Sequence, residues 1–80
     1  MIFLIEYNRP QGRIITFSKF KNSDRVRAEK KRFELELNLN RNKVNHEVVL
    51  LEASTENLLR RTHRRYFETV DMIAGSRKKS

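Results

Sequence analysis

The stretch with the highest density of chemically capable side chains is LLRRTHRRYFE, from residue 58 to residue 68. On a helical wheel its arginines occupy the face opposite Leu59, Thr62 and Tyr66. Guanidinium groups donate several hydrogen bonds and stay charged at physiological pH, which suits contacts with phosphate. The pattern therefore predicts a surface that follows the phosphates of RNA or DNA. The residues assigned to it are Arg60, Arg61, Arg64 and Arg65, extended by Lys30, Lys31 and Arg32 and by Arg77, Lys78 and Lys79.

The alternative interpretation of this stretch is a solvated polar helix face. Glu56, Glu68 and Asp71 stand at helical spacings from the arginines and would partly neutralise them. The sequence lacks the aromatic and glycine-rich signature of RNA-recognition motifs, the Gly-x-x-Gly loop of KH domains, and zinc-finger or helix-turn-helix patterns. We therefore favour the solvated face and keep nucleic acid as the alternative.

Catalysis has little support in the sequence. The segment from Thr62 to Tyr66 gathers a base, cations and a phenol, but adjacent helical residues point in different directions. There is no glycine-rich phosphate loop, nucleophile elbow or metal-ligand spacing, and a chain with two histidines and no cysteine is poorly suited to structural zinc. We expect a protein that is not an enzyme, with no cofactor, no metal and no small-molecule substrate.

The elements that would position these residues belong to one small domain. The chain has 80 residues and a net charge of +8. A domain of this length buries only about 60 to 65% of the surface of its unfolded chain, so self-association is an accessible source of further stability. The absence of cysteine suits a reducing cytoplasm, and the opening MIFLI is too short to cross a membrane.

Three segments have the composition of strands. Residues 2–7 form a continuous apolar run, typical of a central strand covered on both faces. A turn at residues 9–12 leads to residues 13–20, an edge strand in which Ile15 and Phe17 are expected to share one face. Residues 46–53 form the third strand, again apolar on both faces, and His46 would only begin it.

Residues 33–40, FELELNLN, alternate like a strand but are better explained as part of a helix. Glu and Leu are helix formers, and no β-branched residue occurs between Arg27 and Lys43. The helix is expected to start near Ser23 and to end with Asn42 in the left-handed conformation.

This helix would have two apolar stripes on nearly opposite sides. The first consists of Val26, Phe33 and Leu37. The second consists of Ala28, Leu35 and Leu39, which we assign to self-association. One stripe can cover the sheet, and the other must meet a second helix or another copy of the chain.

A second helix is expected after Ser54, which would cap it. Its apolar stripe runs through Leu59, Thr62, Tyr66, Val70 and Ile73, and Gly75 would end it. The expected organisation is one domain over residues 1–74 and a flexible basic tail over residues 75–80.

Together these elements predict an α+β fold, a two-layer ββαβα arrangement with a three-stranded antiparallel sheet of order 2-1-3 and two helices. Two layers would leave one sheet face uncovered, which favours a homodimer. We expect a cytoplasmic interaction or adaptor domain, not associated with a membrane, whose basic helical face meets an acidic protein. The alternative is binding of RNA or DNA through the arginine-rich second helix.

The segments IFLIEYNRPQGRIITF, EVVLLEAS and LLRRTHRRYFE resemble small bacterial proteins of single-domain length. The resemblance covers residues 2 to 68. It implies no activity and no functional residues.

Overall fold

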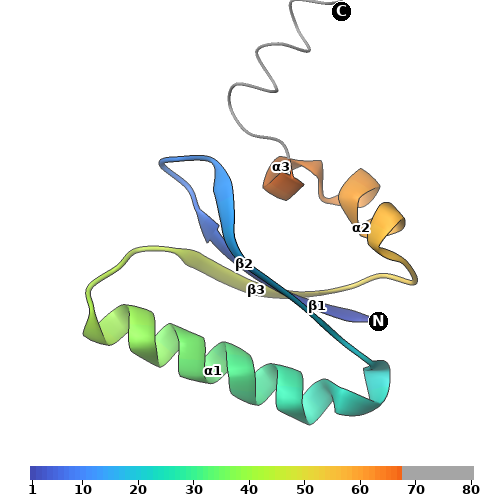
Figure 1. The fold of residues 1–80 in the computed structure, drawn as a ribbon, viewed down its shortest axis with the longest axis horizontal. Coiled ribbons are helices and arrows are strands. Elements are labelled where there is room, and N and C mark those ends of the chain that lie inside the picture. The colour runs from blue at the N-terminus through green and yellow to red at the C-terminus, as the bar shows by residue number, and fades with distance from the viewer. Residues whose placement is uncertain (68–80) are drawn as a thin grey trace, which may run out of the picture.

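A computed structural model describes residues 1–67 of the chain (Figure 1). The three strands are β1 (Ile2–Asn8), β2 (Arg13–Phe20) and β3 (Glu47–Glu52). The helical elements are a 3-10 turn (Asn22–Asp24), α1 (Arg25–Arg41), α2 (Glu56–Thr62) and α3 (Arg64–Phe67). Within residues 1–67, no helix has the length and apolar character needed to cross a membrane.

The sheet has the predicted topology. Its order is β2-β1-β3, and β1 is antiparallel to both neighbours. The α+β fold and the strand order are therefore confirmed. The four residues from Ile2 to Ile5 are fully buried, as the continuous apolar run predicts for a central strand covered on both faces.

The helices lie on opposite faces of the sheet, α1 on one side and α2 with α3 on the other (Figure 1). Phe3, Ile5 and Tyr7 of β1 pack with residues of α2 and α3. The alternate side chain Leu4 lines a hollow together with Leu35 of α1. The layer count is therefore three, and the expectation of two layers with a bare sheet face needs correction. We expected both helices on one face because no feature of the sequence indicates which face of the sheet the helix after β3 will cover.

A β-bulge in the pairing of β1 and β2 changes the alternation expected for β2. The register shifts between Glu6 and Tyr7, so that Tyr7 pairs with Ile14 while Glu6 pairs with Thr16. Ile15 is the extra residue and is 46% exposed. Ile14 and Phe17 both pack against the core on the side of α2 and α3, whereas strict alternation placed Ile15 there with Phe17.

Residues 33–40 are helical, as the sequence analysis favoured. The helix ends in a Schellman arrangement, in which Lys43 N–H donates to Asn40 O (3.2 Å) and Val44 N–H donates to Leu39 O (2.9 Å). The left-handed residue is Lys43, with a φ of 55°. Asn42, expected in that role, instead has a φ of −90°.

The second helical segment is interrupted. Thr55, rather than Ser54, is the N-cap of α2, and its side chain accepts a hydrogen bond from Leu58 N–H at 3.1 Å. The helix breaks at His63, next to Thr62, whose hydroxyl donates to Leu58 O at 2.9 Å. Such side-chain bonds to the preceding turn often bend a helix. Residues 68–80, with the expected stripe residues Val70 and Ile73, the stop at Gly75 and the basic tail, lie outside the described part of the chain.

Candidate interaction surfaces

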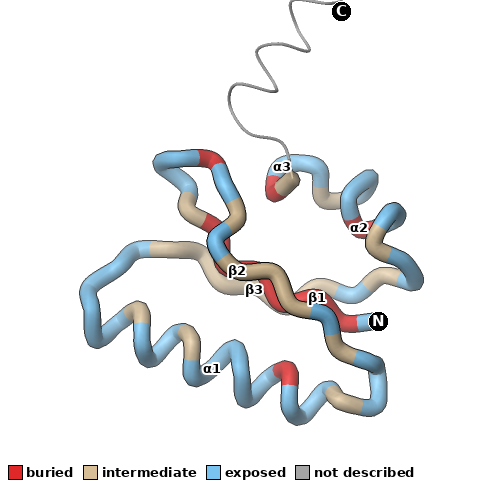
Figure 2. The backbone as a smooth tube through the Cα atoms, in the orientation of Figure 1, coloured by how far each residue is buried: buried red, intermediate tan, exposed pale blue. Residues whose placement is uncertain are grey.

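The first candidate surface is the outer side of α1, which is exposed along most of its length (Figure 2). Val26 is 80%, Phe33 60% and Leu37 41% exposed. We call these three residues the outer stripe. Its apolar side chains have no covering element within residues 1–67, which distinguishes it from isolated exposed apolar residues.

The two stripes of α1 are used the opposite way from the assignment made on the sequence. Ala28 is fully buried, and Leu35 and Leu39 are half-buried. This stripe faces the sheet. The small Ala28 side chain lets the helix approach the sheet closely, and Leu35 lines a hollow with Leu4 of β1. Of the residues assigned to self-association, Ala28 is therefore buried within one chain and Leu35 is half-buried against the sheet, whereas Leu39 also lines a groove between α1 and β3.

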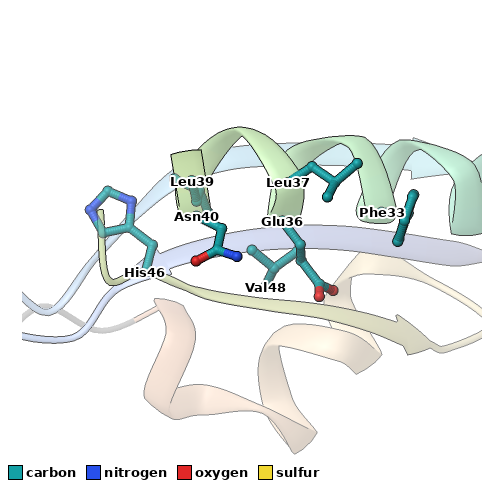
Figure 3. Close-up of a pocket in the computed structure, with 7 residues that line it drawn as sticks. All are labelled: Phe33, Glu36, Leu37, Leu39, Asn40, His46 and Val48. Carbon is teal, nitrogen blue, oxygen red and sulfur yellow. The ribbon is translucent and has the colours of Figure 1, made fainter. Parts of the chain in front are cut away.

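A groove lies between α1 and β3 beside the outer stripe, with a volume of about 410 Å³. We call it the α1–β3 groove (Figure 3). Its lining residues are Phe33, Glu36, Leu37, Leu39, Asn40, His46 and Val48. Phe33 and Leu37 belong to both features, so the exposed stripe and the groove form one continuous surface.

A polar pair lies beside this groove. The Glu6 side chain is buried within β1, and its Oε2 lies 2.6 Å from His46 Nδ1. Thr16 Oγ1 donates a hydrogen bond to Glu6 Oε1 at 2.7 Å.

A carboxylate that orients an imidazole is a familiar part of general-base catalysis. Here, however, the hydroxyl contacts the carboxylate and not the imidazole, so the three groups do not form a nucleophile and its base. Their evident effect is to join β1, β2 and the segment before β3. The sequence analysis gave His46 no such role, although a lone glutamate in an apolar strand is a signal for a buried partner.

Two of the predicted phosphate-binding arginines are held within the chain. Arg60 donates from Nε and Nη2 to Glu56 Oε2, at 3.0 and 2.8 Å, and its guanidinium lies 4.6 Å from the Phe67 ring centroid. Arg65 donates to Glu47 Oε2 at 2.8 Å and lies 4.3 Å from the Tyr66 ring centroid.

Glu47 and Tyr66 form the centre of a second polar cluster. The Tyr66 hydroxyl donates to Glu47 Oε2 and accepts from Arg65 at 2.5 Å. Burial raises the pKa of Tyr66 above its ordinary value of 10.0, and the hydrogen bond to Glu47 and its charge raise it further. Arg9 Nε lies 3.1 Å from Glu47 Oε1, which accepts no hydrogen bond from the described residues, so this contact is one of charge.

Two hollows lie on the side of α2 and α3, and Arg61 and Arg64 border one of them. Arg60, Arg61, Arg64 and Phe67 line one of about 340 Å³. The other, of about 420 Å³, lies between the β1–β2 hairpin and α3. It is lined by Gly12, Arg13, Ile14, Phe17, Arg60, Tyr66 and Phe67. The two hollows share Arg60 and Phe67 and thus form one continuous region.

The basic residues of α1 are not part of this region, because α1 lies on the other face of the sheet (Figure 1). Arg32 Nε lies 3.3 Å from Glu36 Oε1, and Lys31 lines a separate hollow with Leu4 and Thr16. Lys30 is exposed on the same helix. The expectation that Lys30, Lys31 and Arg32 extend the arginine surface within one chain is therefore not supported. Across residues 1–67, no group of three or more His, Asp or Glu side chains is arranged to hold a metal ion.

Comparison of the chain with known proteins finds no matching family model, no matching curated protein and no matching solved structure. Its function must be inferred from its own surfaces.

Proposed function

We propose that this protein is a small, non-enzymatic interaction domain that forms a homodimer through the outer stripe of α1 and the α1–β3 groove. The observation that carries the proposal is the 60% exposure of Phe33 beside a groove of about 410 Å³. We place the domain in the reducing cytoplasm, because the chain contains no cysteine.

The shape of this surface suits two identical partners. Phe33 projects next to a hollow on the same side of the molecule. A twofold axis makes the same patch meet itself, so each copy's Phe33 can enter the groove of the other. A phenyl ring buries a large area and gains further from contact with another ring, which makes Phe33 the expected centre of the interface.

Magnitudes predict a weak dimer. Complete burial of a Val, Leu or Phe side chain contributes roughly 1.5–3 kcal/mol. Scaled by the exposed fractions of Val26, Phe33 and Leu37 and counted for both copies, burial of the outer stripe supplies roughly 5–11 kcal/mol. Association costs about 4–15 kcal/mol in lost freedom, so contacts inside the groove have to add to the stripe. A dissociation constant of about 1 μM corresponds to a net gain of about 8 kcal/mol, so a dimer of that affinity requires a substantial contribution from the groove contacts.

The experiment is sedimentation equilibrium over about a hundredfold range of protein concentration. The natural chain should pass from monomer to dimer as concentration rises. The Phe33→Gln/Leu37→Gln variant should remain a monomer, because the two outer-stripe residues that line the groove are then polar. Leu58→Gln is the matched control, since Leu58 is 42% exposed on α2 and lies on the opposite side of the sheet. A chain that stays monomeric throughout, or a control that dissociates as readily as the double variant, contradicts the proposal.

A further inference from the structure

We propose that the continuous region formed by the two hollows on the side of α2 and α3 binds single-stranded nucleic acid. A nucleobase would enter the hollow between the β1–β2 hairpin and α3, and the neighbouring phosphates would contact Arg13, Arg60 and Arg61. This site lies on the opposite face of the sheet from the outer stripe and does not depend on the proposed dimer.

The hollow has the size and the walls of a base-binding site. Its volume of about 420 Å³ falls within the roughly 300–1,000 Å³ of small-ligand sites. Ile14, Phe17 and Phe67 supply apolar walls, two of them aromatic. Tyr66 is 5% exposed and contributes to the floor, and the Arg60 guanidinium already covers one face of the Phe67 ring at 4.6 Å. Base stacking on aromatic side chains is a main source of affinity for single strands, and it tolerates different sequences.

The aromatic walls are held in place before any ligand arrives. Phe17 packs against the fully buried Phe3, with ring centroids 5.8 Å apart. Phe67 meets Phe17 edge to face, at 5.8 Å and 77°. Tyr66 packs in the same way on Tyr7, at 5.1 Å and 88°. Rings fixed by the core lose little freedom on binding, so the site is preorganised.

The cations lie along the same region. Glu56 holds Arg60 through Oε2, and its other oxygen lies 3.0 Å from Lys19 Nζ. The Nε N–H and one N–H of Nη2 are directed at Glu56, so the N–H groups of Nη1 and the second N–H of Nη2 are the Arg60 donors left to meet a phosphate. Arg13 stands at the hairpin end of the first hollow and Arg61 at the second, with Arg60 and Phe67 between them. Arginine and aromatic side chains thus line the same two adjoining hollows.

The combination of arginine and aromatic side chains favours a nucleic acid over an acidic protein, since carboxylates need cations but not an aromatic hollow. It favours a single strand over a duplex, because a paired base is not free to enter the hollow. The same chemistry is present in a free mononucleotide, which would use one hollow but not the length of both.

The test is fluorescence anisotropy of a labelled 12-nucleotide single strand, titrated with the full chain at several salt concentrations. We expect binding at low salt that weakens as salt rises, by about 0.7 logarithmic units of affinity per unit of log salt for each phosphate contacted. A duplex of the same length and a polyglutamate peptide should bind at least tenfold more weakly. A mononucleotide should compete poorly with the labelled strand.

Two variants of equal charge locate the site. Arg13→Gln/Arg61→Gln should weaken binding about tenfold or more and lower the salt slope by about 1.4, because two phosphate contacts are lost. Lys30→Gln/Lys31→Gln removes the same charge from the other face and should change affinity less than twofold. Phe17→Leu, with its fold checked by circular dichroism, should weaken binding with no change in salt slope.

The proposal is overturned if no strand binds at low salt, or if both double variants lose affinity equally. It is also overturned if the duplex or polyglutamate binds as tightly as the single strand, or if the mononucleotide competes as well as an unlabelled strand. Phe33→Gln/Leu37→Gln should keep its affinity per chain, so failure of the dimer and failure of this site are distinguishable.

Discussion

Glu6 and His46 form a pair 40 residues apart in the chain, with Glu6 Oε2 and His46 Nδ1 separated by 2.6 Å. Glu6 is 4% exposed and stands in the most buried strand of the sheet. An isolated carboxylate in such a place would be costly, whereas one that is paired and hydrogen-bonded is tolerated. The pair therefore ties the segment before β3 to the central strand, and it forms one end of the surface proposed for self-association.

Removing the imidazole should expose this cost. In His46→Leu, the buried Glu6 carboxylate loses its imidazole partner and, among residues 1–67, keeps the hydrogen bond from Thr16. We expect the free energy of unfolding to fall by roughly 2–4 kcal/mol. Glu6→Leu/His46→Leu should recover part of this loss, because both polar groups are then gone. Urea denaturation measures all three proteins, with Asn45→Ala at an exposed neighbouring position as the control. A double variant less stable than His46→Leu would show that the buried charge is not the cause.

Tyr66 should make the stability of the protein sensitive to alkaline pH. Burial, then the hydrogen bond to Glu47 and its charge, raises the pKa of Tyr66 above 10.0 in the folded state. The contribution of protonated Tyr66 to the free energy of unfolding is therefore complete below the ordinary pKa of 10.0, and it is lost as pH rises through the raised pKa of the folded state. The difference in absorbance near 295 nm between the natural chain and Tyr66→Phe isolates the titration of Tyr66. We expect its midpoint above pH 10, and a midpoint at or below that value would rule out the arrangement around Glu47.

Glu56 should titrate in the opposite sense. Hydrogen bonds from Lys19 and then from Arg60 lower the pKa of Glu56 below its ordinary value of 4.5. Its contribution to stability is present above pH 4.5 and is lost as pH falls through the lowered pKa. Carbon-detected NMR titration of the Glu56 carboxyl should show the low value in the natural chain and a rise in Lys19→Gln. Lys21→Gln, which removes the same charge two residues away from Lys19 in sequence, should leave the pKa of Glu56 almost unchanged. Equal shifts in both variants would argue against the specific hydrogen bond from Lys19.

The strands and the first helix could be predicted from local signals. The continuous apolar run of β1 has no plausible position except the centre of the sheet, and β2 spans the residues expected for it. Helix α1 was predicted because residue propensity outweighed alternation in FELELNLN. These features depend on neighbours in sequence, which a single chain displays.

The features that sequence reasoning missed depend on contacts between distant residues. Which stripe of α1 faces the sheet follows from the close approach at Ala28, and wheel geometry treats the two stripes alike. The bulge beside Tyr7 exchanges the places of Ile14 and Ile15 without any change in composition. Glu56, one of the acidic residues expected to neutralise the arginines, does pair with Arg60, but the partner of Arg65 is Glu47, in a strand 18 residues away.

Self-association through Phe33 is the central claim, and isotope-filtered NMR on a mixture of labelled and unlabelled chains tests it most directly. The expected result is a set of nuclear Overhauser effects between chains that join the Phe33 ring of one copy to Leu37, Leu39 or Val48 of the other. Such effects should vanish in Phe33→Gln/Leu37→Gln. Effects between chains that are confined to Ile15, Leu58 or the side of α2 and α3, or none at millimolar concentration, would contradict it.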